Sequence, residues 1–188
     1  DGLATLATIA AALEFPSLDS AAQVRSFLLA YRDRLLLPCE LPSVCQAFLH
    51  TQRNQARELI ALDCGLGSPL QADAFRAASQ TVGRKQLFQL RSLKDQRLVR
   101  RYIQAVEEEE AHGWHTLVYG LVLSVFSLPL RQGLNGFARQ TLRGFIRFAP
   151  ILPISEEQEA GGLLDELCAP VPAALEAILR SHPEFVLE

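Results

Sequence analysis

The sequence predicts an all-α protein: a single-domain bundle of about eight to ten helices spanning residues 1–188. Two neighbouring segments carry this prediction. Between Leu134 and Ala149, apolar residues stand alternately three positions and one position apart, which places them on one face of an amphipathic helix. The preceding run, Leu117 to Leu128, is apolar on nearly every side, as in a helix enclosed by other helices. The sequence contains no alternating runs joined by Asn-Gly or Asp-Gly turns, so strands are not expected.

The first half of the chain carries helix signals that are interrupted by proline and glycine. Asp19 or Ser20 can cap a helix that Pro38 is expected to stop. Gly65 stands where a helix commonly ends in a left-handed residue. Gly83 costs roughly 1 kcal/mol inside a helix, so we expect it to allow close approach of another helix. The helices predicted here cover residues 20–37, 43–52, 54–64 and 70–92.

The second half begins with a segment that Asp95 is expected to cap. The two central helices follow, and the segment 155–158 then has the form of a capping box, which predicts a helix through Cys168. Pro170 and Pro172 precede a last helix that ends near Ser181. The residues expected on the buried face of the segment after Asp95 are Leu98, Val99, Tyr102, Ile103 and Val106.

Length and composition fit one ordinary globular domain. A chain of 188 residues buries roughly 70% of its unfolded surface, so it needs no disulfide or metal to be stable. The net charge of −3 offers no basic excess to neutralise phosphates, so nucleic acid is not an expected partner. The longest apolar run, residues 117–130, is shorter than the roughly 20 residues that span a bilayer, and no membrane partner is expected. Without a visible signal peptide or an initial Met, we expect a cytoplasmic protein whose native beginning is missing here.

The four cysteines, Cys39, Cys45, Cys64 and Cys168, are scattered and form no Cys-x-x-Cys pair. In a domain able to build its own core, they are expected to be reduced and mostly buried, as in a cytosolic protein. Cys39 and Cys45 can lie close together, but their spacing matches no zinc or redox motif. A disulfide or metal role is the less favoured alternative.

Motifs for catalysis are missing from the sequence. It contains no Gly-x-x-x-x-Gly-Lys phosphate loop, no Gly-x-Gly-x-x-Gly after a strand, and no Gly-x-Ser-x-Gly nucleophile elbow. We therefore predict a protein that is not an enzyme and holds no cofactor. The alternative, an enzyme whose site is assembled from distant helices, requires a polar pocket with strongly perturbed titratable groups.

One metal site can be considered, at Glu109, His112 and His115. On a continuous helix these residues share a face, and imidazole with carboxylate suits nickel or zinc. Gly113 lies between the histidines, however, where a break between helices is expected. In the simpler interpretation the acidic run at residues 107–110 is a solvated helix end, His112 lies in a loop and His115 sits in the first turn of a helix.

Four arginines form a ladder on the helix after Pro129. Positions 131, 139, 143 and 147 are spaced four or eight residues apart, with Asn135 at the remaining rung. Like charges at this spacing repel by a few tenths of a kcal/mol per pair, so an acidic partner is expected to offset them. Solvation, or pairing with Glu156, Glu157 and Glu159, is the simpler interpretation. The functional alternative is a partner-binding surface, since arginine is enriched in interfaces; its residues are Arg131, Arg139, Arg143 and Arg147.

Several motifs, taken in order, resemble the UreF family of urease accessory proteins. Residues 76–90 are similar to the family pattern R-x-A-S-x-x-x-G-R-x-L-L-x-L, and residues 58–63 to an upstream E-x-x-x-L-D. Downstream, the family segment G-H-H-x-x-V-F-G is matched except that Trp114 replaces the first histidine. The resemblance covers roughly residues 20 to 150. The residues that carry it most clearly are Ser79, Gly83, Arg84, His115 and Gly120.

The chain departs from the family pattern at both ends of this match. Ala4 stands in place of a glutamate, Ile151 stands where the family has an arginine, and the usual P-L-G-Q is replaced at residues 153–155. The chain therefore resembles a divergent member, and interactions that depend on these segments are not carried over.

The resemblance implies a helical, non-enzymatic chaperone of urease maturation. UreF-like proteins form homodimers and bind the accessory protein UreD, also called UreH. That complex recruits the GTPase UreG and governs nickel delivery to apo-urease. Ser79, Arg84 and His115 are then candidate partner-binding residues, with helix packing and capping as the alternative role. A metal-binding or redox-enzyme maturation chaperone of similar helical fold is the alternative function.

Overall fold

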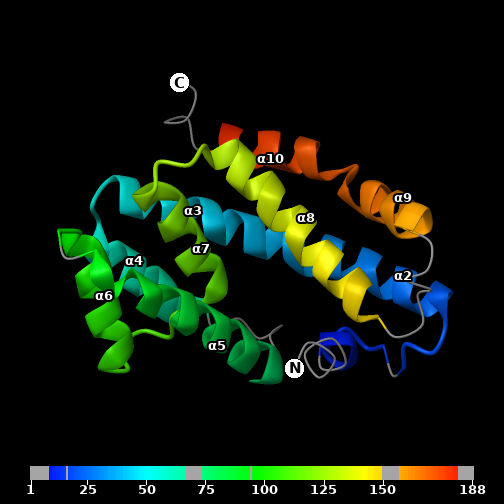
Figure 1. Cartoon of the computed structure of the whole chain (residues 1–188), viewed down its shortest axis with the longest axis horizontal. Helices are drawn as coiled ribbons and strands as arrows, with labels where there is room; N and C mark the ends of the chain where they lie inside the picture. The colour runs from blue at the N-terminus through cyan, green and yellow to red at the C-terminus, as the bar shows by residue number, and fades with distance from the viewer. Residues whose placement is uncertain (1–8, 16, 67–72, 94, 150–156, 182–188) are drawn as a thin grey trace. The chain divides into compact units, whose positions relative to one another are not determined.

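The computed structural model describes residues 9–15, 17–66, 73–93, 95–149 and 157–181, and their regular structure is entirely helical (Figure 1). The all-α prediction is confirmed. Within these residues, no helix is long and apolar enough to cross a membrane. The α-helices are α2 (Ala21–Tyr31), α3 (Leu41–Gln52), α4 (Ala56–Gly65), α5 (Asp73–Gln89), α6 (Arg97–Glu107), α7 (His115–Val125), α8 (Leu130–Phe148), α9 (Glu157–Cys168) and α10 (Val171–Arg180).

The chain divides into two compact units. The terminal unit combines Asp1–Pro42 with Arg131–Glu188, and the central unit is Ser43–Leu130. The prediction of one domain over residues 1–188 stays a prediction. The two units are described separately below.

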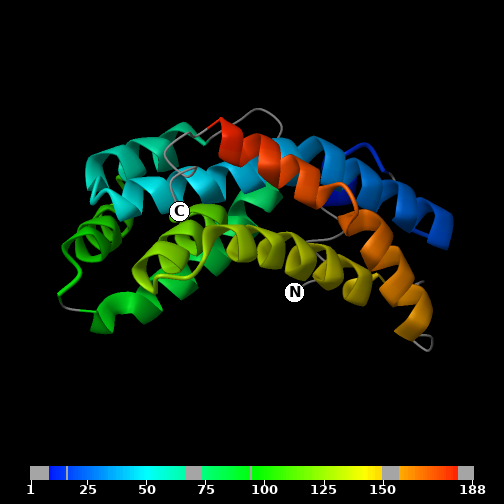
Figure 2. The same cartoon turned by 90° about the horizontal axis from the view of Figure 1, so that it is seen from above.

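In the terminal unit, α2 and α8 share an aromatic core. Ser20 caps α2 as predicted, because its Oγ accepts a hydrogen bond from the Gln23 N–H at 3.2 Å. The Phe145 ring of α8 meets the Tyr31 ring edge-on, with the ring centroids 4.6 Å apart. Helices α9 and α10 lie beside α8 in both views (Figures 1 and 2). The predicted apolar stripe of α8 is buried at Leu134, Phe137, Ala138, Leu142, Ile146 and Ala149.

Pro38 does not end the first helix, so that prediction is wrong. From Arg32 to Glu40 the chain forms a π-helix, with Pro38 inside it, and then continues directly into α3. Proline removes a backbone N–H and clashes with the preceding turn of an α-helix. The wider π turn, in which the Leu41 N–H bonds to the Leu36 carbonyl five residues back, lets the chain keep winding.

In the central unit, α6 and α7 bury the faces that their sequences predict. The stripe on α6 is buried throughout, and α7 is fully buried at Leu117, Val118 and Leu121. The buried part of the apolar run ends earlier than expected, because α7 stops at Val125 and Leu128 is 45% exposed.

In the terminal unit, the last helix, α10, ends at Arg180, which agrees with the prediction.

Two other helix ends differ from the prediction. Gly65 is the last residue of α4, and neither Gly65 nor the following Leu66 adopts the left-handed conformation. Asp95 does not cap α6; the N-cap is Gln96, which makes no side-chain cap hydrogen bond. The predicted capping box falls mainly on residues 155 and 156, which lie outside the described residues.

Candidate functional site

A buried carboxylate organises the turn that precedes α7. Asp63, in the last turn of α4, is fully buried. Its carboxylate accepts hydrogen bonds from the Tyr102 hydroxyl at 2.6 Å, the Gly113 N–H at 2.9 Å and the His112 N–H. Donors from two other segments thus replace the water that this carboxylate loses on burial.

The same aspartate also holds the neighbouring indole. The Asp63 backbone carbonyl accepts a hydrogen bond from Trp114 Nε1 at 2.9 Å, and Trp114 is only 2% exposed. Burial, followed by the nearby Asp63, raises the pKa of the Tyr102 hydroxyl well above its usual value, so this hydroxyl stays protonated as a donor. We call residues 112–115 the Asp63 turn.

Helix α5 contacts the Asp63 turn through a glycine. A Cβ added at Gly83 would lie 2.6 Å from the His115 nitrogen and would also strike the Gly113 carbonyl oxygen. Next to it, Arg84 Nε donates to the His112 carbonyl at 2.9 Å. Gly113 itself has a φ of 73°, which favours glycine. The predicted close approach at Gly83 is therefore present, although it is made to a turn at the start of a helix.

His115 is the first residue of α7, as the simpler interpretation of the sequence expects. Its N–H donates to Ser79 Oγ at 3.3 Å, and its Nδ1 lies 3.0 Å from Gln86 Oε1. Burial lowers the pKa of the imidazole, which favours the neutral ring. Ser79 and His115 thus meet each other within the central unit.

Gly120 brings α7 against α3. A Cβ at Gly120 would lie 2.9 Å from Ala47 Cβ and 3.0 Å from the Phe48 nitrogen, and would strike the Val44 carbonyl oxygen. The small residue allows two helix backbones to approach closely. Gly83 and Gly120 therefore have the same physical role, one at the first residues of the segment from Gly113 to Gly120 and the other at its last.

A comparison with protein-family models matches the UreF model to residues 18–149, which is more than half of the chain. The chain belongs to the UreF family. A search of the curated proteins found no match. UreF proteins are urease accessory proteins, and the resemblance seen in the sequence is confirmed.

The UreF motifs, which are far apart in the sequence, meet at the Asp63 turn. Asp63 comes from the upstream motif, Ser79 and Arg84 from the motif on α5, and Gly113 and His115 from the downstream motif. The sequence shows Asp63 only as part of a family pattern and does not identify it as the centre of this arrangement. One signal was available, because Asp63 lies on the same buried face of α4 as Ala56 and Leu59.

The arginine ladder lies on α8, and two of its four arginines form ion pairs with described acidic side chains. Arg131 contacts Glu176 on α10, and Arg139 Nη2 lies 3.0 Å from Asp165 Oδ1 on α9. Arg143 and Arg147 are exposed and form no ion pair with any side chain that the structure describes. Self-pairing thus occurs for half of the ladder.

The observed acidic partners are Glu176 and Asp165, and pairing with Glu156, Glu157 and Glu159 stays a prediction. Glu156 lies outside the described residues, as do the side chains of Glu157 and Glu159. Both observed pairs are solvent-exposed, so each contributes about 0–1 kcal/mol to stability.

The three candidate metal ligands have separate surroundings. Glu109 is exposed beyond the end of α6, with a φ of 61°, so the helix does not continue to the histidines. The His112 ring packs edge-on against Trp114, and His115 faces Gln86. Across the described ranges, no group of three or more His, Cys, Asp or Glu side chains is arranged to hold a metal ion. Among the described residues, none of the four cysteines forms a disulfide; Cys45 and Cys168 are buried, Cys39 is half-buried and Cys64 is exposed.

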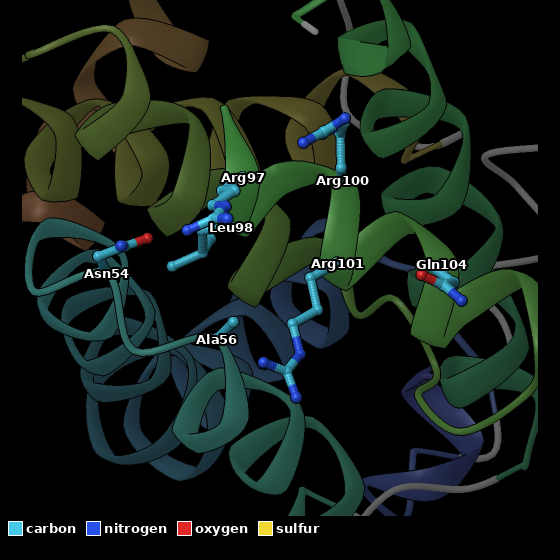
Figure 3. A pocket seen from close by; sticks show the side chains of 7 residues that line it. All are labelled: Asn54, Ala56, Arg97, Leu98, Arg100, Arg101 and Gln104. Atoms are coloured by element: carbon cyan, nitrogen blue, oxygen red, sulfur yellow. The ribbon is translucent and has the colours of Figure 1, made fainter. Parts of the chain in front are cut away.

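A shallow cavity of about 620 Å³ lies beside α6 in the central unit (Figure 3). Burial raises the pKa of the Glu40 carboxyl in the π-helix to about 7, and this residue lies in the terminal unit against Tyr31. Glu40 is not one of the residues that line this cavity. The residues lining the cavity are Asn54, Ala56, Arg97, Leu98, Arg100, Arg101 and Gln104.

Proposed function

We propose that this UreF-family protein is a non-catalytic, cytoplasmic scaffold of urease maturation. In this proposal it forms a homodimer, binds a UreD/UreH-like protein and recruits the GTPase UreG, which then delivers nickel to apo-urease. Family membership supports the maturation role. The observation that carries the proposed partner surface is that Arg143 and Arg147, half of the α8 ladder, form no ion pair with the described side chains.

The unpaired arginines favour a protein partner for a physical reason. Two guanidinium groups one helical turn apart repel each other, and no described acid offsets them within the chain. A partner that supplies carboxylates at this position replaces the repulsion with charge-assisted hydrogen bonds. Arg131 and Arg139 belong to the same surface, but each must first leave its pair with Glu176 or Asp165.

Ser79, Arg84 and His115 take an indirect part in the proposed binding. Their polar groups bond to each other's segments or to the Asp63 turn. We therefore infer that they shape the central unit, and that their replacement alters binding through that shape.

The test compares two double variants on α8. R143Q/R147Q removes two positive charges from the proposed surface. Q132E/Q140E also lowers the net charge by two, at exposed positions of the same helix. Co-purification with UreD-like and UreG-like proteins of the host is expected to fall about tenfold for R143Q/R147Q, which corresponds to 1.4 kcal/mol, and to change little for Q132E/Q140E.

Equal binding by both variants would remove the α8 surface from the proposal. Circular dichroism should give nearly the same melting temperature for both, because exposed substitutions change stability by about 0.5 kcal/mol or less. Nickel content of the purified chain supplies a separate check. Stoichiometric nickel that survives purification would contradict a pure scaffold.

A further inference from the structure

The charged residues in the lining of the cavity beside α6 are all positive. Three of its lining residues are arginines, Arg97, Arg100 and Arg101, while Asn54 and Gln104 contribute side-chain amides. The lining includes no acidic residue. Among the described residues, none of these arginines forms an ion pair, although the whole chain has a net charge of −3.

The position of these arginines does not serve the stability of α6. The N-terminal end of a helix carries a partial positive charge, so cations in its first turns are unfavourable. Helix α6 begins at Arg97, has no acidic residue in its first turn, and lacks a side-chain cap at Gln96. An anion bound in the cavity would offset both the repulsion among the arginines and the helix dipole.

We propose that this cavity binds an acidic segment of another protein. From Arg97 to Gln104 the polar face of α6 extends over roughly 10 Å, and Figure 3 shows Arg100 and Arg101 pointing in different directions from the helix. A single phosphate reaches only part of such a face. Several carboxylates along an extended peptide can reach all of it, and arginine binds carboxylates in bidentate geometry.

The lining favours a protein segment over other anions. It contains no aromatic side chain on which a nucleotide base could stack. The chain's own acidic run, Glu107 to Glu110, is partly engaged already, because Glu107 contacts Arg91 and Glu108 accepts from Gln104. This inference concerns the central unit and does not depend on the α8 surface proposed above.

The experiment measures binding of a fluorescein-labelled decaglutamate peptide to the full chain by fluorescence anisotropy at low ionic strength. The triple variant R97Q/R100Q/R101Q is expected to raise the Kd at least about tenfold. The control R34Q/K85Q/R180Q removes the same charge from exposed positions outside the cavity and should stay within about twofold. A neutral Gly-Ser decapeptide should not bind, and added salt should weaken decaglutamate binding.

Folding of the variants is checked by their melting temperatures. The triple variant should melt no lower than the wild-type chain, because it removes cations from a helix N-terminus. The single variants R97Q, R100Q and R101Q should each raise the Kd about twofold, which keeps the test valid if the triple variant does not fold.

Four outcomes would overturn the proposal. One is no decaglutamate binding, and another is an equal loss of affinity in the triple variant and its control. The third is tighter, arginine-dependent binding of tripolyphosphate or single-stranded DNA, which would replace the acidic protein segment with another anion. The last is self-association of the wild-type chain that the triple variant abolishes, because the occupant would then be the acidic run of a second copy.

Discussion

Each unit of this protein contains a buried carboxylate bonded to a tyrosine hydroxyl, and the two differ in how many other donors reach them. Asp63 and Glu40 both accept from their tyrosines at 2.6 Å. Asp63 also accepts backbone N–H donors from the Asp63 turn, whereas the only described donor to Glu40 is Tyr31. Burial accordingly raises the pKa of Glu40 to about 7.

The difference shows how a buried acid can serve a fold. A carboxylate with several donors replaces its lost water and fixes the segments that supply those donors. A carboxylate with one donor is instead easier to bury in its neutral form. We therefore expect Asp63 to hold the Asp63 turn as an acceptor, and Glu40 to contribute most when protonated.

The largest expected effect comes from replacing the two acids with their amides. Asp63→Asn replaces one carboxylate oxygen with an N–H₂ group, which faces donors and leaves at least one of their N–H groups without an acceptor. We expect it to lower the free energy of unfolding by about 3–5 kcal/mol, as in broken buried networks. Glu40→Gln preserves the Tyr31 bond and carries no charge, so at pH 7 we expect no loss of stability and instead a gain relative to the wild type.

Urea unfolding followed by circular dichroism measures both variants. Equal losses of stability would show that the number of donors does not distinguish these two sites. Tyr102→Phe and Tyr31→Phe serve as controls. Each removes only the tyrosine hydroxyl donor of its own site, and both sites have such a donor.

The second effect is a dependence of stability on pH that Glu40 should produce. Its pKa is about 7 in the folded protein and 4.5 in the unfolded chain, so the folded state binds more protons between these values. The stabilisation is complete below about pH 4.5 and is lost as the pH rises to about 7, by a total of about 3 kcal/mol. Unfolding free energies of the wild type and Glu40→Gln should therefore converge at low pH and differ most above pH 7, where the variant gains.

The comparison of the two pH profiles isolates Glu40 from other titrating groups. Parallel profiles would contradict a neutral Glu40 in the folded state. The same measurement on Tyr31→Phe should extend the pH range of the loss upward, because the hydrogen bond from Tyr31 lowers the pKa of Glu40.

The smallest of the three effects tests whether close packing also holds the Asp63 turn. Gly83→Ala places a Cβ against the backbone of residues 113–115, which cannot move aside as a flexible side chain would. We expect a loss of about 2 kcal/mol. Gly144→Ala is the matched control on α8, because a Cβ there meets nothing within 4 Å and should stabilise the helix by up to about 1 kcal/mol.

The melting temperatures of the two alanine variants measure whether the close contact at Gly83 stabilises the protein. If Gly83→Ala melted as high as the wild type, the turn would not be in close contact with α5. A normal melting temperature for Gly83→Ala together with a low one for Asp63→Asn would assign the stability of the turn to hydrogen bonding alone.

The sequence by itself determined the helices and their buried faces. The spacing of apolar residues from Leu134 to Ala149 depends only on the period of a helix, so the stripe on α8 could be predicted without tertiary information. The cap at Ser20 was likewise local, because a side chain that accepts from an N–H donor three residues away needs no other segment. The order of motifs also identified the family.

Only the tertiary structure decided which polar groups meet. Asp63 is separated from His112 by 49 positions, and nothing local to either residue indicates the bond between them. Pro38 shows the converse, because its usual local effect was overridden when the chain formed a π-helix between α2 and α3. The arginine ladder could be read from the sequence, but the separation of its paired half from Arg143 and Arg147 depends on where Asp165 and Glu176 lie. Periodicity is a property of one segment, whereas a buried polar bond or an ion pair requires two segments to be brought together.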